Sequence, residues 1–261
     1  FFKPRKTITN KDLINTSVQE ITKSSKEKIE LYVEEPVFDG YYSNTCYQNR
    51  ISEALDHFNK QKETDFLNDW DHLIFHLPYA FQGRRMMLDI WLDWINEKGL
   101  MENLEKEIGK LEDSADIKVW KKVVSKSSFY QNFVGQKIEA GEKASMQIGN
   151  MYTASIFMSF LSFLSVAKDN QKELVNNVVG FLSYGSGSKS KILEGKIVDT
   201  WRDKINHLNI FESLNNRNFI DFKTYEKLHN NSLNKVITKK NSMVLKEISN
   251  KENMQGFRYY S

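Results

Sequence analysis

The most apolar run in the chain spans residues 156–167 and follows a polar segment. Asn150 and Thr153 precede this run, and both are common helix-capping types, so the pattern predicts a helix that starts between them and ends near Ala167. Small residues recur along it at spacings of four and three: Ser155, Ser159 and Ser162. Large apolar side chains such as Phe157 cover most of the remaining circumference. We therefore expect a helix that is buried nearly all round and packs closely through its serine face.

Asn150 and Tyr152 lie where this helix is predicted to begin. The first N–H groups of a helix have no partners within the helix, and they favour negative charge that develops nearby. Asn150 and Tyr152 are therefore candidate site residues. A purely capping role for Asn150 remains open, because Asn is also a good N-cap residue.

A second short apolar run, residues 73–75, has the length of a buried strand, and Pro78 ends it. His76 therefore lies at the carboxyl end of a predicted strand, where α/β folds place their ligand crevices. The alternative is a core histidine with satisfied hydrogen bonds. His72 falls on the same face of the strand but too far away to share a metal ion with His76, so the pair predicts no zinc site.

The third apolar run, residues 178–182, also predicts a strand, and a glycine-rich turn follows it at residues 183–188. Such a turn lets backbone N–H groups approach a ligand, which makes Gly185 and Ser186 candidates; a tight structural turn is the alternative. The spacing matches neither a dinucleotide fingerprint, nor a P-loop, nor a nucleophile elbow.

The remaining pattern is mostly helical. We predict helices over residues 45–61, 86–97 and 127–146, with charged helical segments over 99–125 and an extended entry over 31–38. Ser43 is placed to cap the first of these helices, and Cys46 lies inside it as a structural thiol. Arg84 and Arg85 open the second helix, where they either meet a phosphate or form a solvated face. Residues 189–261 alternate Lys/Asn-rich stretches with short apolar patches.

Composition narrows the class of protein. The 261 residues carry 37 basic and 34 acidic side chains, a net charge of +3 that is too small and too evenly spread to indicate nucleic acid. The only cysteine excludes an internal disulfide and suits a reducing cytoplasm. We find no signal peptide or membrane-spanning run, since the apolar helix of about 15 residues is too short to cross a bilayer.

Three motifs in order resemble the 3-hydroxy-3-methylglutaryl-CoA synthases of the thiolase superfamily: residues 75–79 (FHLPY), 149–155 (GNMYTAS) and 181–187 (FLSYGSG). Shorter similarities lie at residues 1–4 (FFKP), 36–47 (PVFDGYYSNTCY) and 257–260 (FRYY). The resemblance implies an α/β fold of the layered thiolase-like αβαβα type with family-specific helical insertions. Residues 1–261 would form the C-terminal domain, and the catalytic cysteine and glutamate would belong to a preceding half.

The resemblance implies an acyltransferase that forms a carbon–carbon bond. Acetyl-CoA and acetoacetyl-CoA would condense through an acetyl-cysteine to 3-hydroxy-3-methylglutaryl-CoA, in the mevalonate route to isoprenoids. His76 matches the catalytic histidine and Asn150 the substrate-contacting asparagine. The matching substrate-binding positions are Ser43, Pro78, Tyr152, Gly185 and Ser186, and the CoA-binding positions are Arg84 and Arg85. The resemblance further implies a cytoplasmic homodimer with no metal, no cofactor beyond its CoA substrates, and no nucleic-acid or membrane partner.

One position departs from the family. Phe81 stands where the family usually has a lysine that contacts CoA, which leaves Arg84 and Arg85 to attract the phosphates. A relative that acts on acyl-carrier-protein substrates in polyketide β-branching therefore remains an alternative, as does a non-catalytic thiolase-fold partner subunit. An acyl-carrier-protein ketosynthase fits less well with the motifs at residues 149–155 and 181–187. We expect the chain alone to be inactive, because Cys46 aligns with a structural cysteine.

Overall fold

The structure is a computed structural model, and it describes residues 5–9, 28–32, 40–112, 116–185, 187–233, 243 and 245–260. The chain divides into two compact units, residues 1–215 and residues 216–261. The strands of the first unit are β1 (Arg5–Thr9), β2 (Lys28–Tyr32), β3 (His72–Phe75), β4 (Val178–Gly185) and β5 (Lys189–Lys196). Its longer helices are α2 (Gly40–Gln61), α4 (Gln82–Glu97), α5 (Met101–Ile108), α6 (Ile117–Val124), α7 (Ser128–Lys137) and α10 (Ala154–Asp169). Its short helices are α3 (Phe66–Asp69), α8 (Glu139–Glu142), α9 (Ser145–Ile148), α11 (Trp201–Ile205) and α12 (Ile210–Asn215).

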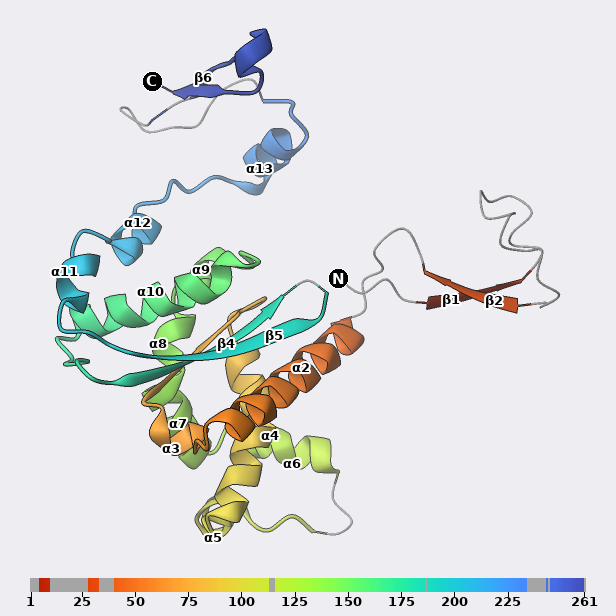
Figure 1. Cartoon of the computed structure of the whole chain (residues 1–261), viewed down its shortest axis with the longest axis vertical. Coiled ribbons are helices and arrows are strands. Elements are labelled where there is room, and N and C mark those ends of the chain that lie inside the picture. The colour runs from red at the N-terminus through yellow and green to blue at the C-terminus, as the bar shows by residue number, and fades with distance from the viewer. Residues whose placement is uncertain are drawn as a thin grey trace. The chain divides into compact units, whose positions relative to one another are not determined.

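The central sheet of the first unit has the strand order β3-β4-β5 (Figure 1). β3 runs parallel to β4, with His72 opposite Val179, and a parallel pair requires a long crossover, which here contains α4 to α10. β4 and β5 form an antiparallel hairpin that closes with Gly185 opposite Lys189. Both strands predicted from apolar runs are confirmed, although β4 extends past the predicted end into the glycine-rich segment. β5 was not predicted. β1 and β2 form a separate antiparallel hairpin.

The two faces of the sheet carry two hydrophobic cores, because successive side chains of a strand point to opposite faces. Leu73 and Phe75 of β3 join the first core with residues of α2 and α4, whereas Ile74 joins the second core with residues of α10. Helices therefore cover both faces of the sheet, as the layered α/β architecture requires.

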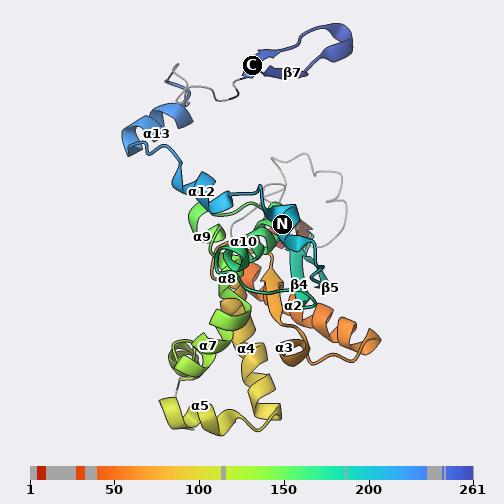
Figure 2. The same cartoon turned by 90° about the vertical axis from the view of Figure 1, so that its left-hand side faces the viewer.

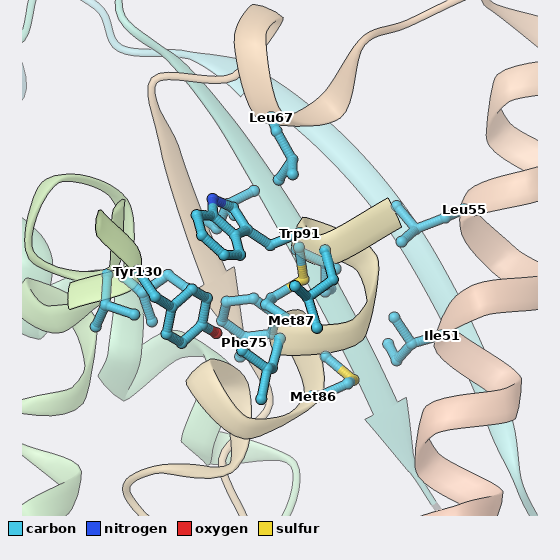
Figure 3. Close-up of a cluster of buried hydrophobic side chains, with 14 of the residues drawn as sticks. Ile51, Leu55, Leu67, Phe75, Met86, Met87, Trp91 and Tyr130 are labelled. Carbon is cyan, nitrogen blue, oxygen red and sulfur yellow. The ribbon is translucent and has the colours of Figure 1, made fainter. Parts of the chain in front are cut away.

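The centre of the first core is formed by large side chains that converge from α2, β3, α4 and α7 (Figure 3). Trp91 of α4 packs edge-on against Tyr130 of α7, with ring centroids 4.9 Å apart, and Met86 and Met87 fill the space beside them. Each fully buried side chain of this size contributes roughly 1.5–3 kcal/mol to folding. This packing holds the start of α4 against the sheet, which fixes the segment that follows His76.

Helix α10 confirms the predicted close packing of its serine face. Ser155, Ser159 and Ser162 are at most 2% exposed, and α10 lies against α8 in both overall views (Figures 1 and 2). The contact is tight, since a Cβ atom at Gly141 of α8 would lie 2.7 Å from the Ser159 hydroxyl. The expectation that α10 is buried nearly all round is wrong, because Phe157 is 71% exposed.

Two further helix predictions need correction. The single helix predicted over residues 127–146 is divided into α7, α8 and α9, with breaks at Ile138 and at residues 143–144. The Ile138 side chain is buried in the first core, and the change of direction there brings α8 against α10. Helix α2 begins at Gly40, so Ser43 lies within its first turns and does not cap it.

The second unit contains α13 (Phe222–His229), β6 (Leu245–Ile248), a 3₁₀ helix (Glu252–Met254) and β7 (Arg258–Tyr260). Asp221 caps α13, since its side chain accepts the backbone N–H of Thr224 at 2.7 Å. β6 and β7 pair in antiparallel fashion. In the described part of the chain, no helix combines the length and the apolar character that crossing a membrane demands.

Candidate functional site

His76 follows β3 directly and extends its pairing with β4. Its backbone N–H donates to the carbonyl oxygen of Leu182 at 3.0 Å, and the residue is 8% exposed. The predicted position of His76 at the carboxyl end of a strand is therefore confirmed. Because β3 and β4 are parallel here, the carboxyl ends of both strands meet beside the imidazole.

Ser155, in the first turn of α10, holds the imidazole of His76. The Ser155 Oγ lies 2.7 Å from Nδ1 of His76 and also accepts the backbone N–H of Leu77 at 3.0 Å. Among the described residues, Nδ1 of His76 is the only acceptor bonded to this hydroxyl, so we assign the hydroxyl proton of Ser155 to the bond with Nδ1. Nδ1 is then the acceptor, and the ring proton lies on Nε2. His76 in this tautomer presents an N–H donor on the edge of the ring opposite Ser155.

Two tyrosines lie next to His76. The Tyr47 hydroxyl of α2 donates to the backbone carbonyl of His76 at 2.7 Å, and the rings of Tyr47 and Tyr184 pack edge to face at 4.6 Å. Each tyrosine ring centroid is 6.3 Å from that of His76. Burial raises the pKa of Tyr47 far above its usual value, so this hydroxyl stays a neutral donor. Three elements distant in sequence, α2, β3 and β4, thus converge on the histidine.

Burial also determines the charge of His76. Taking the ring out of water disfavours the imidazolium and lowers the pKa of His76 below its usual value. The ring is therefore neutral at physiological pH and able to donate a hydrogen bond from Nε2 without carrying a charge. A neutral donor at the mouth of a parallel strand pair suits a carbonyl oxygen on which negative charge develops.

The segment of residues 149–153 lies immediately before α10. The Asn150 Oδ1 accepts the backbone N–H of Tyr152 at 2.7 Å, so Asn150 closes a local turn and does not cap α10, whose N-cap position is Thr153. The NH₂ group of the Asn150 side chain has no hydrogen-bond partner among the residues that the structure describes. Tyr152 has a φ of 50° and is 64% exposed. The turn places Asn150 and Tyr152 just ahead of Ser155, on the same chain segment that holds His76.

The other candidate substrate-binding residues are distributed around the same point. Ser43 is exposed and precedes Tyr47 by one helical turn, so both lie on one face of α2. Pro78 follows His76 by two residues and is half-buried. Gly185 ends β4 next to Tyr184. Ser186 lies outside the described residues.

The two candidate CoA-binding arginines have different environments. The Arg84 guanidinium donates to the Glu142 carboxylate of α8 through two nitrogens, and its Nε lies 2.9 Å and 3.2 Å from the two carboxylate oxygens. The Cζ of Arg84 also lies 4.8 Å from the centroid of the Phe81 ring. Burial raises the pKa of Glu142, and Arg84 opposes that rise. Arg85 is exposed, with its guanidinium 5.4 Å from the centre of the Tyr79 ring. Arg85 is thus available to a phosphate, whereas Arg84 is engaged inside the protein.

Four residues that contact or support this site were given no role by sequence reasoning: Ser155, Tyr47, Tyr184 and Glu142. Ser155, Tyr47 and Tyr184 lie inside the quoted motifs, which was the available signal, but they are 29 to 108 residues away from His76, which each of them contacts. Nothing in the sequence around Glu142 indicated its role, because its partner Arg84 is 58 residues away. In the part of the chain that the structure describes, no group of three or more His, Cys, Asp or Glu side chains is arranged to hold a metal ion.

Comparison with protein families matches residues 22–260 to the C-terminal region of hydroxymethylglutaryl-coenzyme A synthase. A hydroxymethylglutaryl-CoA synthase of Haloferax volcanii is 26% identical over 204 residues, which cover 74% of this chain and 46% of that protein. The chain thus spans about half the length of this relative.

Solved structures show the same fold. MvaS in complex with 3-hydroxy-3-methylglutaryl coenzyme A superposes with a TM-score of 0.61 at 20% identity, covering 87% of this chain and 52% of that one. The HMG synthase of the curacin biosynthetic pathway, in complex with an apo donor-ACP, superposes with a TM-score of 0.54 at 18% identity, covering 76% and 42% of the two chains. These likenesses show a thiolase-like α/β fold, as the sequence predicted.

Proposed function

Because the chain belongs to the hydroxymethylglutaryl-coenzyme A synthase family, we propose that it supplies the acetoacetyl-CoA side of a hydroxymethylglutaryl-CoA synthase site. In the proposed reaction, an acetyl group on a cysteine outside residues 1–261 loses a proton and attacks the C3 carbonyl of acetoacetyl-CoA. Hydrolysis of the thioester to the enzyme then releases 3-hydroxy-3-methylglutaryl-CoA. The coenzyme A thioesters are the only cofactor-like groups that this reaction needs.

The observation that carries the proposal is the hydrogen bond between Ser155 and His76. With the Ser155 proton assigned to Nδ1, the imidazole, which burial keeps neutral, carries its proton on Nε2, and we propose that this proton stabilises the oxygen of the C3 carbonyl as it becomes an alkoxide. Because such a bond strengthens as the charge develops, it lowers the barrier and not only the KM. The proton that the acetyl methyl gave up to a base outside residues 1–261 is returned to the alkoxide and completes the tertiary alcohol.

Asn150 is proposed to hold the thioester oxygen of the same substrate. Its Oδ1 is used by the backbone of Tyr152, which turns the NH₂ group outward as a donor. An amide donor does not titrate, so this contact persists across the pH range of the enzyme. Tyr152 and Ser43, both exposed, are proposed to line the entrance for the substrate's arm.

A carrier-protein substrate is the second candidate, and Phe81 favours it. Phe81 is 37% exposed at the start of α4 and offers no charge to a CoA phosphate. One structural neighbour is an HMG synthase in complex with a donor-ACP. A synthase that accepts a carrier-bound acyl group would use the same His76 geometry and differ only in what lies at the far end of the phosphopantetheine.

The proposal includes a cytoplasmic homodimer. The single cysteine, Cys46, is half-buried in α2 and suits a reducing compartment. We also propose that residues 1–261 alone do not condense acyl groups, because Cys46 lies within a helix turn beside Tyr47 and not at a nucleophile's position. Incubation of the isolated chain with radiolabelled acetyl-CoA should leave it unlabelled, and stoichiometric acetylation of Cys46 would overturn this assignment.

The test separates the two half-reactions in the complete gene product that carries residues 1–261. His76→Gln should reduce condensation with acetoacetyl-CoA by about 10²–10⁴, while acetylation of the enzyme by acetyl-CoA stays near the wild-type rate. His72→Gln is the matched control, because His72 is a half-buried histidine at the first residue of β3, where its ring packs against Phe163. This control should leave both half-reactions intact.

Equal damage to both half-reactions by His76→Gln would show that the residue only supports the fold. Replacing acetoacetyl-CoA with an acetoacetyl carrier protein distinguishes the two candidates. A wild-type enzyme that condenses the carrier-bound substrate and not acetoacetyl-CoA would establish the β-branching function instead.

A further inference from the structure

A hollow of about 400 Å³ lies at the surface of the first unit between α4, α6 and the start of α7. Its lining residues are Phe81, Arg84, Arg85, Leu88, Lys118, Lys121, Lys122, Ser125, Tyr130 and Gln131. The volume is within the range of small-molecule sites. Among the described residues, the lining contains five basic side chains and no acidic one, so the hollow favours an anionic ligand.

The lysines of α6 reach the hollow because of their spacing. Lys118, Lys121 and Lys122 are separated by three and four residues, which places them on one face of the helix. The Lys121 ammonium bonds Asp89 of α4 at 2.7 Å and ties α6 to α4. This ion pair orients the lysine face of α6 toward the arginines of α4.

Three of the five cations have no carboxylate partner in the described part of the chain. Arg84 is paired with Glu142, but Arg85, Lys118 and Lys122 form no ion pair with any carboxylate of the described residues. Like charges one turn apart on a helix repel each other, and cations gathered from two helices add to this repulsion. An anion bound between them would relieve it, and a phosphate is the group that several Lys and Arg side chains bind well.

We propose that this hollow binds the phosphate groups at the nucleotide end of a coenzyme A thioester, with Lys118 and Lys122 of α6 acting together with Arg85. The inference rests on the proposed function and adds Lys118 and Lys122 of α6 to the residues that anchor its substrate. Phe81 lines the hollow and follows His76 by only five residues, so its Cα lies within about 18 Å of that of His76. That separation is within reach of an extended pantetheine arm. Phe81 and Leu88 supply apolar surface for the adenine ring.

The hollow also explains how a chain with Phe81 in place of a cation can hold CoA. The positive charge is supplied from α6, more than thirty residues further along the chain, and not from the turn that precedes α4. A carrier protein, in contrast, would bring its phosphopantetheine without a nucleotide and would leave a concave site of this volume unfilled.

The test measures binding to the complete gene product by calorimetry, with coenzyme A, adenosine 3′,5′-bisphosphate and pantetheine as separate probes. Lys118→Ala/Lys122→Ala should weaken binding of coenzyme A and of the bisphosphate by the same factor, roughly three- to thirtyfold, since each exposed contact contributes modestly. Pantetheine, which has no phosphate, should bind both proteins equally. The difference should shrink as salt is raised. Lys60→Ala/Lys204→Ala, which removes two exposed lysines outside the hollow, is the matched control and should bind all three probes like wild type.

The binding data distinguish failure of this inference from failure of the proposed function. If wild type binds coenzyme A and the Lys118/Lys122 variant binds it equally well, the hollow is not the phosphate site and the proposed function stands. If wild type binds neither coenzyme A nor the bisphosphate, both the hollow and the CoA-dependent function are rejected. Binding of an acidic carrier protein that the variant loses, with coenzyme A binding unchanged, would assign the lysine face of α6 to that partner and overturn the inference.

Discussion

The hydroxyl of Ser155 lies 2.7 Å from Nδ1 of His76, and the two residues are separated by 79 positions in the chain. The same oxygen accepts the N–H of Leu77, so one buried side chain satisfies a backbone donor and is also the hydrogen-bond partner of the histidine ring. This contact joins the start of α10 to the end of β3. The orientation of the imidazole therefore depends on the packing of the serine face of α10.

We predict that Ser155→Ala lowers both activity and stability. The change leaves Leu77 N–H and His76 Nδ1 unpaired in the interior, which typically costs about 1–3 kcal/mol of unfolding free energy. The imidazole is then free to adopt the other tautomer, so condensation should fall by at least about tenfold with little change in KM for acetoacetyl-CoA. Chemical denaturation and steady-state kinetics measure the two effects.

Ser165→Ala provides the control for that variant. Ser165 is also buried on α10, but its hydroxyl has no hydrogen-bond partner among the described residues. Its removal should leave stability and activity unchanged or slightly raise stability, because replacing an unpaired buried hydroxyl removes a desolvation cost. Equal effects of the two alanine variants would show that the bond to His76 has no special role.

Stability should decrease as the pH falls from 6.5 toward 4. Burial lowers the pKa of His72 to about 4, assisted by Lys137 and Lys172 and opposed by Asp71, and burial also lowers the pKa of His76. Between these values and the unfolded value near 6.5, the unfolded chain binds more protons than the native one, so acid favours unfolding. Each fully titrating histidine contributes up to about 1.4 kcal/mol per pH unit. Urea denaturation at several pH values measures the slope.

His72→Gln should flatten that slope between pH 6.5 and 4, since it removes the histidine with the larger resolved shift. The unfolding free energy at pH 8 serves as the reference for each protein. An unchanged slope in the variant would mean that His72 titrates in the native state much as it does in the unfolded chain.

The elements that sequence reasoning located correctly are those whose signal is local. β3, β4 and α10 each coincide with an apolar run, and burying most of such a run is favourable whatever it packs against. β5 was missed because its residues, KSKILEGK, alternate exposed and half-buried side chains and form a strand only by pairing with β4. The breaks near Ile138 and residues 143–144 were missed for a similar reason, since they depend on packing against α10.

The candidate site shows the same difference between features with a local sequence signal and features that depend on the tertiary fold. The motifs containing His76, Asn150 and Gly185 were found as separate segments, and the structure brings the first two together through Ser155. The pairing of Arg84 with Glu142 was not predicted, because Glu142 lies in a helix whose position depends on the tertiary fold. The phosphate contact of Arg84 stays a prediction. Adjacent arginines in a sequence carry no information about which of them points into the protein.

We predict that the ion pair between Arg84 and Glu142 is structural. Glu142 is 1% exposed, and removing one partner of a buried pair typically costs about 3–5 kcal/mol because the other charge is left without compensation. Glu142→Ala should therefore destabilise the protein by about this amount. Arg85→Ala, at the exposed neighbour of Arg84, should change stability by less than about 0.5 kcal/mol.

A double-mutant cycle completes this test. Arg84→Ala/Glu142→Ala should be less destabilising than the sum of the single variants, since the double variant leaves no unpaired buried charge. Additive losses in denaturant unfolding would indicate that the two side chains stabilise the fold independently, through packing against Phe81 and α10.

Gly180 of β4 allows the packing between Trp70 and the sheet to be tested directly. A Cβ atom at Gly180 would lie 2.0 Å from Cε3 of Trp70, a side chain that is fully buried and whose Nε1–H donates to Glu194 at 3.0 Å. The indole cannot move aside without breaking that bond, so Gly180→Ala should destabilise the protein by about 3 kcal/mol or more, at the upper end of overpacking effects. Gly195→Ala, on the neighbouring strand, is the matched control. A Cβ there would meet Phe181 at 3.8 Å, an ordinary contact, and the change should be below about 1 kcal/mol. Similar thermal unfolding midpoints for the two variants would refute the close approach of Trp70 to the strand that leads to the glycine-rich turn.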